Sequence, residues 1–387
     1  MFYNLFLKEL YLILKNHQTM KKITFLFVIV LLITSCKKES PTVEFKKYDE
    51  TAELVEQQKH PNKRMRLKLI QSKFLDMNDV FAPFKDDLAT FSEDDYNELK
   101  PMILEQDIPT LQAHIGNGNL SYEKLTLFYL YRIRKFESDS TKSLNSIIAL
   151  NPNVVKEARQ KDKEMGANSE YSIYGMPILL KDNINTNDMP TTAGAIALVD
   201  NKNTNDAFIV EKLRENGALI LGKANLSEWA YFFCSGCPVG YSAVGGQTLN
   251  PYGRKVFETG GSSSGSGVTV AANFAVAAVG TETSGSITSP SSQNSVVGLK
   301  PTIGLLSRTG IVPISSTLDT PGPMTKSVID NAIFLNAMLG KDVEDDKSVD
   351  SKIDFIKDLK NYSIKGKRFG VLEDLMSDSL YTRNVRV

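Results

Sequence analysis

The chain has 387 residues, 42% of them hydrophobic, and its 45 lysines and arginines balance its 45 aspartates and glutamates. This balance argues against a nucleic-acid partner, because proteins that bind a phosphate backbone carry a basic surface. The length and the hydrophobic content are sufficient for a sizeable buried core, so the composition fits a folded, soluble body.

The N-terminal region has the form of an export signal. Met20-Lys21-Lys22 precede a mostly apolar stretch, Ile23 to Ile33, which is too short to span a bilayer but fits the core of a signal peptide. The Ile33-Thr34-Ser35-Cys36 segment that follows resembles a bacterial lipoprotein box and implies that Cys36 becomes the lipidated first residue. We therefore expect residues 1–19 to be a non-native upstream extension and residues 20–36 to be a lipoprotein signal peptide. The mature protein is then extracytoplasmic, with a bacterial membrane as its partner through the lipid anchor.

Residues 37–104 are charged and are expected to form a tether and a helical N-terminal region, with prolines such as Pro61 and Pro101 as breaks. Ser121 is a suitable N-cap for a helix over residues 122–136, whose apolar residues recur at helical spacing. Residues 144–165 suggest helices joined around Asn151-Pro152.

Short apolar strands then alternate with helices. Strands are predicted over residues 177–180 and 218–221, with a helix near residues 207–216 between them. This alternation predicts α/β layers.

Two glycine-serine clusters follow, Gly260 to Gly267 and Gly280 to Ile287. Most runs of this composition are flexible linkers. Here the intervening residues 268–279 are almost entirely apolar and must be buried, so they hold both clusters on a rigid core. A lysine in an apolar frame, Lys181, stands upstream and follows the predicted strand.

Serines, a lysine and glycines that let backbone N–H groups face a ligand are the components of a Ser–Lys acyl-transfer site. The chain has only three histidines, His17, His60 and His114, all in its first third. This distribution argues against a Ser-His-Asp triad, although the fold could still bring His60 or His114 close. Burial in the apolar frame would lower the pKa of Lys181 and make it a better base.

At these residues the chain resembles the amidase signature family, serine hydrolases with a Ser–Ser–Lys triad. The resemblance rests on Gly-Gly-Ser-Ser followed by Gly-Thr-Glu-Thr-Ser-Gly-Ser-Ile, with the family's interval of 24 residues between the two serines. The segments at 222–230, 245–252, 298–304 and 319–325 agree with it, and within the family the chain is most similar to the peptide amidase branch.

The resemblance implies roles for individual residues. Ser286 is the acyl-forming nucleophile, Ser262 is the bridging serine that follows a cis peptide bond, and Lys181 is the terminal base. The remaining implied residues are the oxyanion-hole N–H groups of Thr283, Ser284, Gly285 and Ser286, and the supporting loop residues Gly260, Gly261 and Ser263. The chain departs from the family at Ser284 and Ser264, where glycine is usual.

No metal or cofactor is expected. Cys234 and Cys237 form a Cys-Ser-Gly-Cys segment, but a zinc site would need further cysteines or nearby histidines. Whether these two cysteines form a disulfide stays open.

The resemblance also implies the architecture, an α/β/α sandwich around a mixed sheet, in an amidase signature domain over residues 105–387. Family members continue well past Val387, so we expect the C-terminal part of this domain to be missing after a strand near residues 368–372. The predicted function is hydrolysis of small amides or peptide amides. The alternatives are a glutaminase subunit of a tRNA-dependent amidotransferase, against which the export signal argues, and an inactive, truncated surface lipoprotein.

Overall fold

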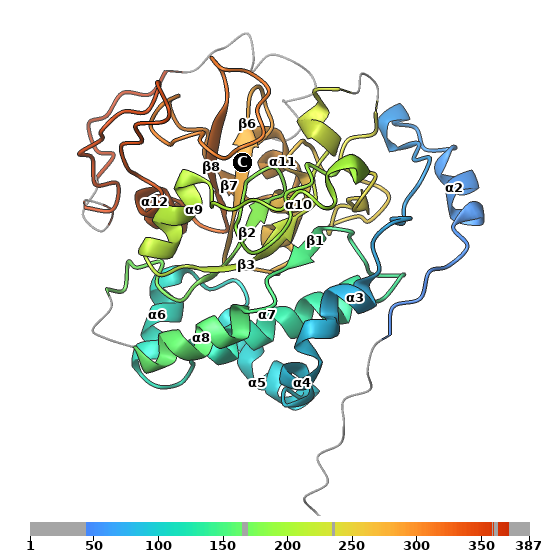
Figure 1. Cartoon of the computed structure of the whole chain (residues 1–387), viewed down its shortest axis with the longest axis horizontal. Coiled ribbons are helices and arrows are strands. Elements are labelled where there is room, and N and C mark those ends of the chain that lie inside the picture. Colours follow the sequence, from blue (N-terminus) through green and yellow to red (C-terminus); the bar gives the residue numbers. More distant parts are fainter. Residues whose placement is uncertain (1–43, 165–168, 234–236, 358, 360–362, 371–387) are drawn as a thin grey trace, which may run out of the picture.

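A six-stranded mixed sheet forms the centre of the fold (Figure 1). The computed structural model describes residues 44–164, 169–233, 237–357, 359 and 363–370. The strand order is β1 (Ile147–Leu150), β3 (Leu219–Ala224), β2 (Pro177–Lys181), β6 (Ala277–Glu282), β8 (Thr320–Thr325) and β7 (Val297–Gly298). Strand β2 runs parallel to both β3 and β6, and the other three pairs are antiparallel. A separate two-stranded ribbon pairs β4 (Tyr241–Ser242) with β5 (Gly246–Gln247).

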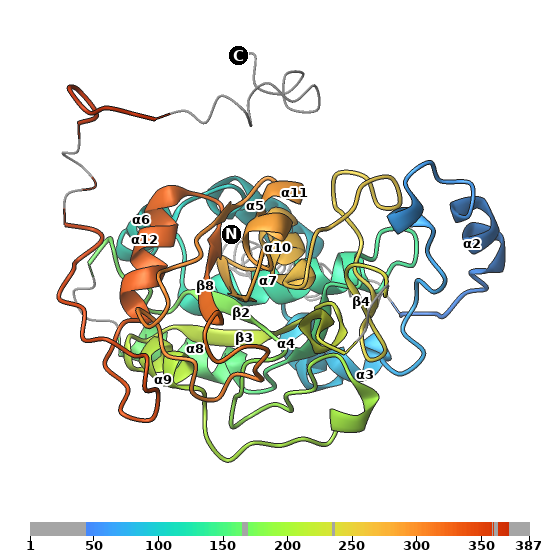
Figure 2. The ribbon, with the colours of Figure 1, turned by 90° about the horizontal axis from the view of Figure 1, so that it is seen from above.

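Helices cover both faces of the sheet. In the described residues they are α2 (Thr51–Gln57), α3 (Met77–Phe81), α4 (Lys85–Ala89), α5 (Glu93–Ile103), α6 (Ile108–Gly116), α7 (Tyr122–Glu137), α8 (Val154–Lys163), α9 (Phe208–Glu215), α10 (Ser264–Ala271), α11 (Thr288–Gln293) and α12 (Val328–Ala337), with 3₁₀ turns η1 (Lys63–Met65), η2 (Ala82–Phe84), η3 (Ile196–Leu198) and η4 (Glu228–Tyr231). Figure 2 shows α10 and α11 on one side of β2 and β3, and α8 and α9 on the other. Every residue of β2, β3, β6 and β8 is buried, as strands covered on both faces require.

Several predicted elements are confirmed. Ser121 caps α7, because its hydroxyl accepts the Lys124 N–H at 3.1 Å. The strands expected at 177–180 and 218–221 are β2 and β3, and the helix between them is α9. The apolar residues between the two glycine-serine clusters form most of α10 and the start of β6, and the strand is wholly buried.

Two predictions of secondary structure are wrong. Residues 147–150, expected to be helical, form the edge strand β1, because β3 offers them an antiparallel partner. Residues 368–370, expected in a strand, belong to no strand, and residues 371–372 lie outside the described part of the chain. The export signal and Cys36 also lie outside it.

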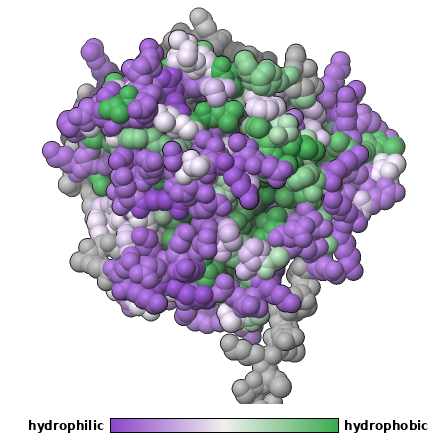
Figure 3. All heavy atoms as spheres, in the orientation of Figure 1, coloured by the Kyte–Doolittle hydropathy of each residue, from purple (hydrophilic) through white to green (hydrophobic). Residues whose placement is uncertain are grey.

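The described surface matches a folded soluble body. Figure 3 shows hydrophilic residues over most of the face seen in Figure 1, with hydrophobic residues gathered above and to the right of its centre. Within the described ranges, no helix has the length and apolar character needed to cross a membrane.

Helix α10 comes very close to the end of β3 through Gly265. The Gly265 N–H donates to the Asn225 carbonyl at 2.9 Å. A Cβ at position 265 would lie 2.3 Å from that same carbonyl oxygen and 2.8 Å from the Ser146 carbonyl oxygen. Only glycine therefore fits where α10 carries the first serine cluster toward the sheet edge.

We expect Gly265→Ala to lower the free energy of unfolding by about 1–3 kcal/mol, because the added methyl group overpacks a backbone contact that cannot yield. Gly116→Ala, at the end of α6, is the matched control, since a Cβ there meets nothing within 4 Å. Urea unfolding of both variants measures the difference. Equal stabilities would show that α10 can move away from β3.

Candidate active site

The candidate site lies where two parallel strands end side by side. Ile178, Leu179 and Leu180 of β2 are in register with Ala277, Ala278 and Val279 of β6. Carboxyl ends of parallel strands meet at one edge of a sheet, where ligand sites of α/β folds usually form. Lys181 at the end of β2 and Thr281 near the end of β6 therefore meet there.

The amine of Lys181 is fully buried among three oxygen atoms. Its Nζ lies 2.7 Å from Ser262 Oγ, 2.8 Å from Thr281 Oγ1 and 3.2 Å from the Thr281 carbonyl oxygen. A neutral amine has two N–H groups and one lone pair, so these three partners match its full hydrogen-bonding capacity.

Burial lowers the pKa of Lys181 to about 7, and the negative charges of Asp319 and Glu282 oppose this shift. Desolvation disfavours the ammonium form, because a charge loses more hydration than a neutral amine does. At neutral pH a large fraction of Lys181 is therefore neutral and able to accept a proton.

Ser262 is held in place by the loop before α10. The peptide bond between Gly261 and Ser262 is cis, as the resemblance implied. Gly260 has a φ of +64°, and a Cβ there would lie 2.7 Å from the Pro290 nitrogen. Ser263 ties the loop to β6, because its hydroxyl donates to the Thr281 carbonyl at 3.1 Å.

Ser286 lies in the turn that follows β6. Its carbonyl accepts the Ser263 N–H at 3.2 Å, which places Ser286 beside the Ser262 loop. Lys181 and Ser262 are completely inaccessible, whereas Ser286 keeps 9% of its surface exposed. The structure thus brings together the three predicted catalytic residues, with Ser286 nearest to solvent.

Glu282 organises the Ser286 turn. Its carboxylate accepts the N–H groups of Gly285 at 2.8 Å, Ile287 at 2.7 Å and Thr288 at 2.9 Å. Burial raises the pKa of this carboxyl, but the three hydrogen bonds outweigh burial and hold the pKa below its ordinary value. Glu282 therefore stays ionised and fixes the backbone on both sides of Ser286.

This arrangement modifies the predicted oxyanion hole. The Gly285 N–H points at the Glu282 carboxylate, so one of the four expected donors is already taken. Within the described residues, the N–H groups of Thr283, Ser284 and Ser286 donate to no protein acceptor.

The departures from the family pattern are accommodated by the backbone. The left-handed position of the turn is Gly285, with a φ of +85°, and Ser284 has no positive φ. Ser264 also lacks a positive φ, and its hydroxyl donates to the Gly260 carbonyl at 2.7 Å.

A second buried ion pair lies on the opposite side of β2 and was not predicted. Lys223 Nζ is 3.9 Å from Asp182 Oδ1, and both side chains are inaccessible. Burial lowers the pKa of Lys223, and the Asp182 charge opposes this shift. The signal in the sequence was Lys223 itself, inside the apolar run of β3.

The open questions on histidine and cysteine are partly answered. His60 makes a local contact with Asn62, and the carbonyl of His114 accepts the Asn119 N–H, so neither contact joins the site. Cys237 is disulfide-bonded, and its partner lies outside the described residues. In the described part of the chain, no group of three His, Cys, Asp or Glu side chains could hold a metal ion.

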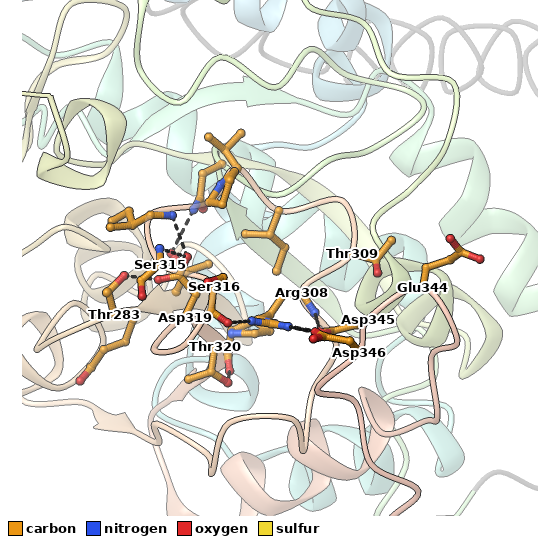
Figure 4. A pocket seen from close by; sticks show the side chains of 18 residues that line it. Thr283, Arg308, Thr309, Ser315, Ser316, Asp319, Thr320, Glu344, Asp345 and Asp346 are labelled. Carbon is orange, nitrogen blue, oxygen red and sulfur yellow. Dashed lines mark hydrogen bonds and ion pairs between the residues drawn. The ribbon is translucent and has the colours of Figure 1, made fainter.

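A cavity of about 260 Å³ opens beside Lys181. Its inner wall contains Asn183 and Thr281, and the residues leading to Ser286, Glu282 and Thr283, continue that wall. The other walls come from residues 308–321 and 344–346. Figure 4 shows Thr283 and Ser315 near Asp319, and Arg308 directed at Asp345.

Comparison with known proteins decides the family. The Amidase family model matches residues 124–386, which is more than half of the chain. The chain belongs to the amidase family. It is 40% identical over 280 residues to a probable amidase of Arabidopsis thaliana, covering 70% of this chain and 54% of that relative. It is also 36% identical to a glutamyl-tRNA(Gln) amidotransferase subunit of Thermoanaerobacter pseudethanolicus, over 70% of this chain and 54% of that one.

Solved amidase structures share the fold. An amidase family protein from Bacillus anthracis matches with a TM-score of 0.71 and 43% identity, over 75% of this chain and 59% of that chain. The native peptide amidase of Stenotrophomonas maltophilia matches with a TM-score of 0.60 and 48% identity, over 63% of this chain and 50% of its own. The chain therefore spans about half the length of the amidase relatives that it matches.

The buried amine makes a prediction for stability. Lys181 binds its proton with a pKa of about 7 in the folded protein and near ~10.4 in the unfolded chain. Between these values the unfolded chain holds more protons, so this residue makes the free energy of unfolding rise with pH. Relative to Lys181→Met, the wild type should gain up to about 1.4 kcal/mol per pH unit between pH 7 and 10, and nothing below pH 7.

Denaturant unfolding across this pH range provides the measurement. Lys352→Met is the control, because the Lys352 side chain is 84% exposed and should contribute no such slope. A wild-type curve parallel to that of Lys181→Met would mean that Lys181 stays charged in the folded state.

Proposed function

We propose that this amidase hydrolyses the C–N bond of small amides or peptide amides through Ser286, Ser262 and Lys181. The observation that carries the proposal is the dry Lys181 amine, 2.7 Å from Ser262 Oγ, in a loop whose next residue hydrogen-bonds to Ser286. Ser286 is the member of the set that a substrate can reach.

In the proposed mechanism, neutral Lys181 accepts the proton of Ser262 Oγ, and Ser262 accepts the proton of Ser286 Oγ. The Ser286 oxygen forms a bond to the amide carbonyl carbon, and the carbonyl oxygen becomes an oxyanion. The unoccupied N–H groups of Thr283, Ser284 and Ser286 are the donors available to it, and losing one such donor costs an enzyme roughly 3–4 kcal/mol.

The C–N bond then breaks, and the relay returns a proton to the leaving nitrogen. Water attacks the acyl-enzyme, gives its proton to the same relay and releases the acid and free Ser286. The relay uses no cofactor. Lys181 suits both directions of transfer because its pKa is near the working pH, where a general base is most effective.

The comparisons support an amidase of the peptide amidase branch over a component of an amidotransferase. Identity to the peptide amidase is 48%, against 36% to the amidotransferase protein. The export signal predicted at residues 20–36 favours the same choice.

The relay makes a prediction for activity. Ser286→Ala should abolish release of ammonia from a peptide amide, because no nucleophile remains to form the acyl-enzyme. Lys181→Ala should lower kcat by about 10³-fold or more, because the serines lose their base. Ser292→Ala, an exposed serine on α11, is the matched control and should keep full activity.

Covalent labelling separates the enzyme from the inactive alternative. A fluorophosphonate should attach to Ser286 in wild type and in Ser292→Ala, as read by mass spectrometry of the labelled peptide. Folded protein that takes up no label would favour the inactive lipoprotein. Folded Lys181→Ala with near wild-type turnover would rule out the proposed base.

We also propose that Cys36 anchors the mature protein to a bacterial membrane. The basis is the Ile33-Thr34-Ser35-Cys36 segment behind an apolar stretch of signal-peptide length. One acyl chain binds a membrane only marginally, so stable anchoring requires more than one chain on the modified cysteine.

The full chain expressed in a bacterium should enter the membrane fraction and leave it with detergent but not with salt. Cys36→Ala should remain an unlipidated precursor or become soluble, whereas Cys234→Ala should stay anchored. Fractionation with mass spectrometry of the N-terminal peptide tests this. Native, unmodified protein in the cytoplasm would contradict both the anchor and the localisation.

A further inference from the structure

Asn183 presents a buried oxygen without a partner. Its side chain is 2% exposed and lines the cavity beside Lys181. The Nδ2 group donates to Thr281 Oγ1 at 3.0 Å, and the same hydroxyl oxygen lies 2.8 Å from Lys181 Nζ. Oδ1, in contrast, receives no hydrogen bond from any described residue.

This orphan oxygen indicates a ligand. Buried polar groups in native proteins are almost always paired, and an exception in a cavity points to a function or to a bound molecule. Strand alternation places Asn183 on the same side of the chain as Lys181, two residues earlier. An amide oxygen can only accept, so its missing partner is an N–H or O–H donor.

The size of the cavity indicates which part of a substrate it holds. A primary amide releases ammonia, which is one heavy atom. The cavity of about 260 Å³ has the volume of roughly nine water molecules in the liquid. It therefore suits the acyl part of the substrate. In a peptide amide, that part carries a backbone N–H on the atom next to the α-carbon.

The walls of the cavity are acidic. Five carboxylates and one guanidinium line it, a formal charge of −4: Glu282, Asp319, Glu344, Asp345, Asp346 and Arg308. Arg308 is paired with both Asp345 and Asp346. Among the described residues that line the cavity, no cation is thus left to bind a substrate carboxylate.

We propose that this cavity binds the acyl part of an amide substrate, and that Asn183 Oδ1 accepts the N–H of the residue whose amide is cleaved. The acidic walls favour neutral or positively charged acyl groups over anionic ones. This inference rests on the proposed amidase function and specifies its substrate class as peptide amides with a free N–H and no nearby carboxylate.

The test compares two substrates that differ in one atom. N-acetyl-alaninamide offers the N–H, and O-acetyl-lactamide has an ester oxygen in its place. Wild type should favour the first by about tenfold in kcat/KM, measured as ammonia release, which corresponds to one hydrogen bond. In Asn183→Ala the preference should fall below about threefold, because the acceptor is gone.

The ratio separates recognition from a structural role. If Asn183 only supports Thr281, Asn183→Ala lowers both rates by the same factor and keeps the tenfold preference, which would overturn the inference. Asn183→Ser serves in the same way should the alanine variant not fold. Equal rates of wild type on the two substrates would overturn the inference without any variant.

Charge is tested on wild type with N-acetyl-lysinamide and the α-amide of N-acetyl-glutamate. We expect about tenfold higher kcat/KM for the lysine compound, and a preference for the glutamate compound would overturn the role of the acidic walls. Failure of the proposed function gives a different result, since no ammonia is then released from any of the four substrates and Ser286 takes no fluorophosphonate.

Discussion

The site depends on one constraint, which is that the amine of a lysine must stay dry at the end of a buried strand. Moving an ammonium ion out of water costs far more than moving a neutral amine, so the fold itself selects the basic form of Lys181. Two oxygens of Thr281 and one of Ser262 replace the lost water. The parallel pairing of β2 with β6 fixes the distance between these groups, and the Ser263 hydroxyl locks the serine loop to the same strand.

Much of the fold follows from local patterns in the sequence. The apolar runs that became β2 and β3 are short and are bounded by turns, and α7 has both a cap and a helical spacing. Strand β1 could not be recognised in the same way. Its four residues, Ile147 to Leu150, fit one turn of a helix as well as a strand, and the partner that decides between them lies more than 70 residues downstream.

The site shows the same division. Lys181, Ser262 and Ser286 could be chosen because serines and a lysine in glycine-rich and apolar settings have few other uses, and the spacing matched a known family. The function of Glu282 was not visible, because its three acceptor contacts depend on how the turn folds back. Asn183 had a weak signal, its position two residues after Lys181, but its unpaired oxygen is a property of the packed structure alone.

The Ser286 turn also bears on how such proteins are found. Only one position in it, Gly285, has a backbone conformation that favours glycine, and a Cβ there would meet no other atom, so the restriction comes from φ alone. Position 284 has no such restriction and faces solvent. A sequence pattern that demands glycine at both positions would discard this chain, although its turn is intact. A pattern built on the backbone would instead require the acidic residue at 282 and the glycine at 285, and would leave position 284 open.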